Sequence, residues 1–395
     1  LLIHLADKSI IIYEDLKDRF RMLETIKQYG SVKLNENNDE TGIHLKLINY
    51  FKSISAFEKF RSADKSITEW MNIMDAEHNN ILSAIEWLMK NRMYEMCSDI
   101  VTELGNFWNT RGHVLTGYKI VKDLLEHRAE INKSNTAILY SESGNFLRAQ
   151  GIFEKAKESY EKCLELSLDL DFKSQIAIAL LGLGNAEAQT GNFKKAESFF
   201  KKSLAVSREC DYTSGITFSL NNLGNISLVL GDLNQAEKYN KESLEINRKS
   251  GNKRDIAFTL DTMSNILIEL GNYELSLKCL EECLEITREI GDKSGIAFAL
   301  NNMSGIFHRK GNNEQAKSYL EESLRIRLEI EDKNGIAYSY FNLGNIFFEE
   351  KKFEQAREYF RNSLKLRIEL GDMLGIAYSV LSVNSILEKE NKSLN

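Results

Sequence analysis

The sequence repeats itself every 40 residues from about position 151 to its end. Leucine and isoleucine each recur at six equivalent positions without exception, and glycine recurs at five positions with a lysine in the sixth. These positions are Leu164, Leu204, Leu244, Leu284, Leu324 and Leu364; Ile176, Ile216, Ile256, Ile296, Ile336 and Ile376; and Gly151, Gly191, Gly231, Gly271, Gly311 and Lys351. One repeat cannot bury its apolar side alone, so the period predicts stacked units that share a continuous core.

Each repeat has the pattern of two helices. From Asp292, about 18 residues with apolar side chains at helical spacing lead to Gly311-Asn312, and a second such run extends to Ile330. Glycine commonly follows the end of a helix, and Asp or Asn commonly caps the start of one. The expected caps of the first helices are Asp211, Asn252, Asp292, Asp332 and Asp372. The fold class predicted from this pattern is an all-α solenoid of helix pairs.

Composition supports this expectation and excludes several classes of protein. The 395 residues include no proline, the residue that a helix interior rejects. The net charge of −7 disfavours direct binding to nucleic acid. We find no apolar run of about 18 residues and no secretory signal, so we expect no membrane contact. The five cysteines lack paired spacing, so we expect a reducing, cytoplasmic location and no structural zinc.

The residues within each repeat resemble the tetratricopeptide repeat. Leu-Gly pairs at 183–184, 223–224 and 343–344 precede the turn residue by about seven positions, and the second helix carries an alanine, an aromatic and a small residue. The period is longer than the usual value of about 34 residues, and the terminal proline is missing, so the helices should be longer. The resemblance covers about residues 97–395. It implies a right-handed superhelix with a concave groove lined by first helices.

The first 95 residues do not repeat. We expect short strands at 9–13 and 19–23, a helix at 24–29, a polar linker at 35–41, and helices at about 43–61, 66–78 and 78–92. Gly112 precedes Gly151 by 39 residues, which indicates a degenerate first repeat. The chain starts with Leu1 and not with Met, so we expect it to be processed or part of a longer protein.

This N-terminal part also carries a resemblance. LADKSII at 5–11 and RFRMLETIKQYG at 19–30 resemble the end of the winged-helix domain in bacterial STAND-class signalling ATPases, the AfsR-like or LuxR-type regulators. WMNIMDAEHNNILSAIEW at 70–87 and FWNTRGH at 107–113 resemble the connector to their repeat array. The resemblance implies a winged-helix remnant at 1–34, a helical connector at 35–95 and an array at 96–395. It also implies an upstream nucleotide-binding domain, because no P-loop motif is present here. The alternative is that these helices merely cap the first repeat.

No residues form a pattern that supports catalysis. The six histidines are scattered, and none has the spacing of metal ligands. Pairs such as Glu281-Glu282 lie on second helices, where a solvated face explains them better than acid–base chemistry. We therefore expect a non-enzymatic chain with no catalytic residue, metal or cofactor.

Asparagines and aromatic residues recur on the first helices, on the face opposite the apolar stripe. Asparagine is a mediocre helix former, so its repetition needs a reason. A side-chain amide can both donate to and accept from a peptide backbone, and proteins of the resembled family use such asparagines to hold an extended peptide. The candidate groove residues are Asn185, Phe218, Asn221, Asn222, Asn225, Phe258, Asp261, Asn265, Phe298, Asn301, Asn302, His308, Arg309, Tyr338, Asn342 and Asn345.

Structural roles are the alternative for these residues. The asparagines after Leu-Gly, at 185, 225 and 345, can equally bridge neighbouring helices. For the pairs at 221–222 and 301–302, and for Asn342, we favour groove lining. The rings at 218, 258, 298, 338 and 378 can either line the groove or pack between repeats.

The expected function is that of a protein- or peptide-binding sensor arm of a STAND-type ATPase. A ligand that prefers one curvature of the superhelix would release contacts to the upstream domain. Two alternatives stay open: a free-standing scaffold, or the regulatory arm of another enzyme such as a protease, kinase or cyclase. A small-molecule ligand also suits an aromatic-lined groove.

Overall fold

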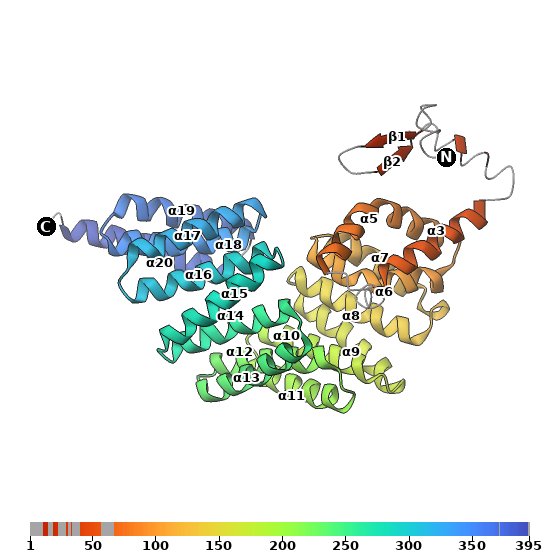
Figure 1. Ribbon diagram of the computed structural model, residues 1–395, viewed down its shortest axis with the longest axis horizontal. Helices are drawn as coiled ribbons and strands as arrows, with labels where there is room; N and C mark the ends of the chain where they lie inside the picture. Colours follow the sequence, from red (N-terminus) through yellow and green to blue (C-terminus); the bar gives the residue numbers. More distant parts are fainter. Residues whose placement is uncertain are drawn as a thin grey trace. The chain divides into compact units, whose positions relative to one another are not determined.

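The computed structural model of the protein is almost entirely helical (Figure 1). It describes residues 11–14, 19–22, 29–30, 33, 40–56, 67–370 and 372–393. The chain divides into two compact units, Leu1–Ile152 and Phe153–Asn395, which we call the N-terminal and C-terminal units. This division lies inside the predicted array of residues 96–395, and the predicted borders after residues 34 and 95 remain predictions.

The N-terminal unit starts with a β-hairpin. β1 (Ile11–Glu14) pairs antiparallel with β2 (Arg19–Met22), at the two places where strands were expected. A two-stranded hairpin is at best marginally stable by itself. Between this hairpin and residue 40, the described residues add only helical positions 29, 30 and 33, so the expected α+β winged-helix remnant is not supported. Most of the predicted helix at 24–29 and linker at 35–41 lies outside the described residues.

Helices make up the rest of this unit. They are α3 (Glu40–Ser55), α5 (Ile67–Lys90), α6 (Tyr94–Thr110), α7 (Val114–Glu126), the 3-10 turn η2 (Arg128–Glu130) and α8 (Lys133–Ala149). The expected helix break at residue 78 is wrong, because α5 is continuous over 24 residues. Its polar middle is satisfied locally: Asn80 Nδ2 donates to Glu77 at 2.8 Å, and Ser83 donates to the Asn79 carbonyl at 3.0 Å.

Aromatic side chains fill the core of the N-terminal unit. Trp70, Phe107 and Trp108 are buried, and the indole Nε1 of Trp108 donates to His78 Nε2 at 3.1 Å. Burial and the neighbouring His113 ring together lower the pKa of His78, which suits its role as an acceptor. The tryptophan-containing motifs at 70–87 and 107–113 thus contribute residues to the core of this unit.

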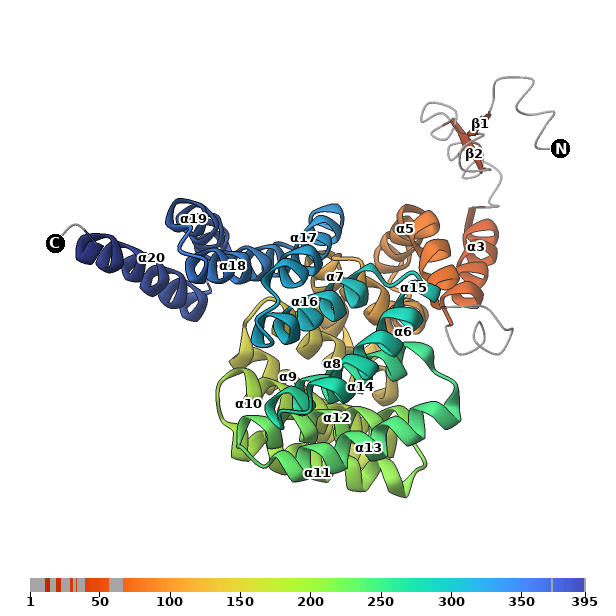
Figure 2. The same ribbon diagram turned by 60° about the vertical axis from the view of Figure 1, so that its left-hand side comes forward.

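The C-terminal unit consists of helices that follow one another in chain order, each packed on the next (Figures 1 and 2). Even-numbered helices from α10 onward are the first helices of repeats, and odd-numbered ones are the second helices. They are α9 (Phe153–Asp169), α10 (Lys173–Gln189), α11 (Phe193–Glu209), α12 (Thr213–Val229), α13 (Leu233–Ser250), α14 (Lys253–Glu269), α15 (Tyr273–Glu289), α16 (Lys293–Arg309), α17 (Asn313–Glu329), α18 (Lys333–Glu349), α19 (Phe353–Leu370) and α20 (Met373–Ser393). The predicted all-α solenoid of helix pairs is confirmed.

The turns show why glycine recurs. The five turn glycines have φ between 74° and 83°, a left-handed conformation that costs other residues energy. Lys351 takes the sixth position with φ 61°. The expected caps Asn252, Asp292, Asp332 and Asp372 each accept from the N–H three residues ahead.

The expected cap at Asp211 is wrong. Asp211 has φ 51°, and the residue before α12 is Tyr212, which makes no side-chain cap. Asp211 occupies the left-handed position that Gly251 and Gly291 hold in later repeats. Asp tolerates this conformation better than most residues, so the side chain that resembled a cap serves the preceding turn.

A small hydrogen-bonding side chain ties the helices of each repeat together. At one position of the second helix, the donor reaches a carbonyl of the preceding first helix at 2.8–3.4 Å. The donors are Ser203, Ser243, Cys283, Ser323 and Ser363, and the acceptors are the carbonyls of Ala177, Thr217, Ala257, Ala297 and Ala337. Burial raises the pKa of the Cys283 thiol to about 12, so this cysteine packs as a small residue and is not a reactive thiol.

Candidate functional site

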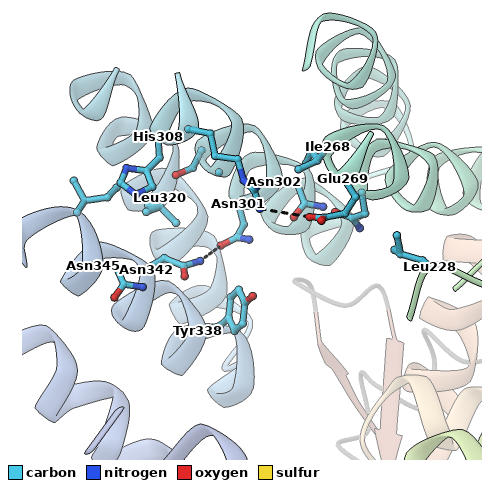
Figure 3. A pocket seen from close by; sticks show the side chains of 15 residues that line it. Leu228, Ile268, Glu269, Asn301, Asn302, His308, Leu320, Tyr338, Asn342 and Asn345 are labelled. Atoms are coloured by element: carbon cyan, nitrogen blue, oxygen red, sulfur yellow. Dashed lines mark hydrogen bonds and ion pairs between the residues drawn. The ribbon is translucent and has the colours of Figure 1, made fainter. Parts of the chain in front are cut away.

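A hollow of about 350 Å³ lies on the first helices of the C-terminal unit (Figure 3). Residues of α12, α14, α16 and α18 line it, together with the buried Leu320 of α17. The first helices α10, α12 and α14 each pack on the next first helix, whereas α16 and α18 contact each other less. The hollow includes residues of both α16 and α18.

Half of the candidate groove residues line this hollow. They are Asn265, Asn301, Asn302, His308, Arg309, Tyr338, Asn342 and Asn345. The others lie elsewhere: Asn185, Phe218, Asn221, Asn222, Asn225, Phe258, Asp261 and Phe298. The sequence analysis missed the lining residues Leu228, Ile268, Ser304, Gly305, Leu320 and Ile346. A signal for Leu228 and Ile268 exists, because they occupy the last turn of the helices that carry the asparagines.

Several of the candidate asparagines bridge neighbouring first helices. Asn302 Nδ2 donates to Asp261 Oδ1 at 2.8 Å, and Asn342 Nδ2 donates to Asn301 Oδ1 at 3.1 Å. Asn221, 3% exposed, donates to Thr259 of the next repeat at 3.2 Å. The hydrogen bonds of these side chains therefore join successive repeats to one another.

Asn222 has a different internal partner. Its Nδ2 donates at 2.9 Å to the carbonyl of Phe218, one turn earlier in the same helix. Asn222 therefore contributes neither to a bridge between helices nor to the hollow.

The asparagines after the Leu-Gly position behave differently. Within the described part of the chain, the side chains of Asn185, Asn225, Asn265 and Asn345 make no hydrogen bond, and all four are partly exposed. Asn265 and Asn345 both line the hollow, and Asn345 is labelled in Figure 3. Their amides are available to a ligand.

The charged residues at the edge of the hollow compensate one another. Arg309 of α16 pairs with Glu269 of α14 at 3.4 Å. His308 lies 3.4 Å from Glu349 and 3.0 Å from the amide oxygen of Asn313. The hollow therefore presents amides, Tyr338 and aliphatic groups more than net charge.

Asp261 is the unusual acid of this region. Burial raises its pKa to about 6, and the hydrogen bond from Asn302 offsets part of this rise. The equivalent positions in neighbouring repeats, 221 and 301, are asparagines. A carboxylate here serves the same bridging role as those amides, at the cost of burying a charge.

The aromatic stripe is about half exposed. Phe218, Phe258, Phe298 and Tyr338 have exposed fractions of 44%, 51%, 48% and 52%. Packing between repeats therefore leaves much of each ring uncovered. Phe298 also stacks on the buried guanidinium of Arg327, with 5.0 Å from Cζ to the ring centroid.

Metal ligands and membrane spans were sought among the residues that the structure describes. Among them, no group of three His, Cys, Asp or Glu side chains is arranged to hold a metal ion. None of the helices that the structure describes is both long enough and apolar enough to span a membrane.

The sequence signature of the tetratricopeptide repeat matches residues 135–209, 216–289 and 295–369, which is more than half of the chain. The chain therefore belongs to the tetratricopeptide repeat family. Its array is a protein-interaction domain, and the repeat fold in general is not an enzyme fold.

One curated relative is "Putative HTH-type transcriptional regulator Rv0890c" of Mycobacterium tuberculosis. It is 25% identical over 124 residues, which make up 31% of this chain and 14% of the relative. The chain thus matches only about a seventh of that relative's length.

Two solved structures share the fold. The STAND protein PH0952 of Pyrococcus horikoshii, which has a tetratricopeptide repeat sensor, matches with a TM-score of 0.63 and 16% identity over 98% of this chain and 54% of that chain. A Rap protein complexed with Competence and Sporulation Factor matches with a TM-score of 0.56 and 11% identity over 89% and 99% of the two chains. At these identities, both likenesses show a common fold.

Proposed function

We propose that the first-helix face of the C-terminal unit binds an extended segment of a protein or peptide, with the hollow at its centre. The observation that carries this proposal is the pair of unpartnered amides of Asn265 and Asn345 in a hollow that also exposes aliphatic groups and Tyr338. The charged residues Arg309 and Glu269 of the same hollow pair with each other. An extended backbone offers donors and acceptors that side-chain amides match. Partly exposed rings beside the amides offer contact area for apolar side chains.

We further propose that the chain is the sensor arm of a cytoplasmic STAND-type signalling ATPase. The likeness to PH0952, whose sensor consists of the same repeats, and the match to HTH-type regulators support this role. A ligand would act by favouring one curvature of the repeat stack, and so shift the equilibrium of contacts to an upstream nucleotide-binding domain. The chain itself would contribute binding and no catalysis.

A free-standing binding protein is the second candidate. The likeness to the Rap protein covers 99% of that chain, so the same architecture exists in a protein of comparable extent. The coding region upstream of Leu1 separates the two candidates. A P-loop sequence in frame supports the sensor arm, and a start codon at or just before Leu1 supports the free-standing protein.

Binding can be tested with a random 12-residue peptide library displayed on phage and selected on the whole chain. A fluorescein-labelled peptide from this selection then reports affinity by polarisation. Asn265→Ala with Asn345→Ala should weaken binding about tenfold or more, because two hydrogen bonds are lost. Asn222→Ala is the matched control, since its amide is satisfied within its own helix. Failure to recover any peptide, or equal binding by all variants, would contradict the proposal.

A further inference from the structure

One position of the first helices carries the amides that have no partner. It is the position after Leu-Gly, occupied by Asn185, Asn225, Asn265, Gly305, Asn345 and Ser385 in successive repeats. Four of the six residues are therefore asparagine, and we call this series the amide row. The row is interrupted once in its middle, at Gly305, and this interruption coincides with the hollow.

Gly305 leaves open space on the exposed side of α16. No heavy atom lies within 4 Å of the position that a Cβ would occupy there. By contrast, a Cβ at Gly184 would lie 2.5 Å from the ring of Phe200, so that glycine is required by packing. Packing does not require Gly305, and its backbone is helical, so turn geometry does not require it either. A glycine costs about 1 kcal/mol relative to alanine in a helix, which calls for a compensating reason.

The first-helix positions that share one face with the amide row carry no charged side chain, and the nearby Arg309 and Glu269 pair with each other. Each of the six first helices places three residues, about one turn apart, on the face that carries the amide row; of these, Gly182 and Thr262 are buried. They are Ile178, Gly182 and Asn185; Phe218, Asn222 and Asn225; Phe258, Thr262 and Asn265; Phe298, Asn302 and Gly305; Tyr338, Asn342 and Asn345; and Tyr378, Ser382 and Ser385. None of these side chains belongs to Asp, Glu, Lys or Arg, although these four residue types make up 28% of the chain. A charged partner would find no unpaired counter-charge at these positions, whereas an uncharged partner loses little on burial.

We propose that the side-chain amides of the amide row form hydrogen bonds with the backbone of an extended, uncharged polypeptide segment. The gap at Gly305 admits one large uncharged side chain of that segment. This inference rests on the proposed function. Asn265 and Asn345 hold the backbone on the two sides of the gap. Leu228, Ile268, Ile346 and Tyr338 line the space that the inserted side chain enters.

The spacing of the helices sets the register. Packed helices lie about 8–10 Å apart, and an extended chain rises about 3.3 Å per residue, so one repeat corresponds to about three residues. Asn265 and Asn345 are two repeats apart and should contact residues about six positions apart. The inserted side chain belongs to the residue midway between them.

The test is the substitution Gly305→Asn in the whole chain, which places an asparagine at the interrupted position of the amide row. The substitution needs no unusual backbone conformation and meets open space, so the fold should be kept, which thermal unfolding by circular dichroism verifies. The labelled peptide selected from the phage library on the unaltered chain is the probe. Its affinity should fall about tenfold or more in Gly305→Asn, because the new side chain occupies the space of the inserted one.

Two controls define the outcome. Gly305→Ala adds only a methyl group and should weaken binding less than Gly305→Asn. A peptide of the same length in which alanine replaces the midway residue should bind the unaltered chain and the Gly305→Asn variant with equal affinity. If peptide binding requires Asn265 and Asn345 but Gly305→Asn binds the selected peptide as tightly as the unaltered chain, the insertion is overturned and the proposed function stands. If no peptide depends on Asn265 and Asn345, both fail.

Discussion

The first and second helices of the C-terminal unit have nearly the same length and the same period, but they satisfy their polar groups in opposite ways. Second helices carry ion pairs that join one repeat to the next, between Arg208 and Glu242, Arg248 and Glu282, and Arg288 and Glu322. First helices carry the amide row, in which the amides of Asn185, Asn225, Asn265 and Asn345 lack partners in the described structure.

This difference separates a surface that supports the stack from one that is available for binding. Exposed ion pairs contribute about 0–1 kcal/mol each, so the second helices gain modest stability and leave few groups unsatisfied. The four amides of the row contribute nothing comparable to the stack, since they make no hydrogen bond within the described part of the chain. Substitutions on the two surfaces should therefore affect different measurements.

The largest effect is expected where a second helix packs into a first helix. Phe200 is 1% exposed and packs against Gly184, so Phe200→Ala should lower the free energy of unfolding by about 3–5 kcal/mol. Phe218→Ala removes the same ring from the exposed stripe and should cost less than about 1 kcal/mol. Urea denaturation measures both. Equal losses would mean that the exposed stripe is part of the core after all.

The next effect concerns Asp261, whose pKa of about 6 lies above its ordinary value near 3.8. The folded state then binds this proton more readily than the unfolded state, so the contribution of Asp261 to stability rises as the pH falls from about 7 to 4. Asp261→Asn should stabilise the protein by about 2 kcal/mol at pH 7 and remove that part of the pH dependence. The bridge to Asn302 should persist, as the Asn342–Asn301 pair illustrates. Denaturation at pH 4.5 and 7 tests this, and a loss of stability at pH 7 would contradict it.

A smaller gain is expected at the turn between α18 and α19. Lys351 has φ 61°, where the other repeats place glycine. A left-handed conformation costs a residue with a Cβ about 1–2 kcal/mol, partly offset by the entropy of glycine in the unfolded chain. Lys351→Gly should therefore raise stability by about 0.5–1 kcal/mol, seen as a higher midpoint of thermal unfolding. Gly311→Lys is the reverse change and should lower it.

The smallest effect is expected on the second-helix surface. Arg248 contacts both carboxylate oxygens of Glu282 at 2.8 Å, and both side chains are about half exposed. Arg248→Met should cost at most about 1 kcal/mol, and the difference should shrink in 1 M NaCl. Peptide binding should not change. A weaker peptide complex in this variant would show that the two helix surfaces are not independent.

The sequence predicted the fold well because its strongest signals are local. Apolar spacing and turn glycines depend on neighbours within one repeat. The helix pairs, and caps such as Asp292, could therefore be predicted from the sequence alone. Errors arose where the local pattern was ambiguous. Asp211 resembled a cap one residue too early, and the polar middle of α5 resembled a break although its side chains bond within the helix.

The candidate site was predicted less completely, because it depends on contacts between repeats. Asn222 and Asn225 lie one turn apart in the same helix, and only their surroundings show which amide is satisfied. Gly305 was not among the candidate residues, since the open space around it is visible only when α16 and α18 are placed. Aliphatic residues such as Leu228 resemble core residues in any sequence.

The most direct test of the account observes the side-chain amides themselves. In the chain labelled with ¹⁵N on asparagine, NMR can follow each side-chain amide while the selected peptide is added. The account predicts that the amides of Asn185, Asn225, Asn265 and Asn345 shift, whereas that of Asn222, bonded within its helix, stays in place. Shifts at Asn222 with none at Asn265 and Asn345 would contradict the claim that the unpartnered amides form the binding surface.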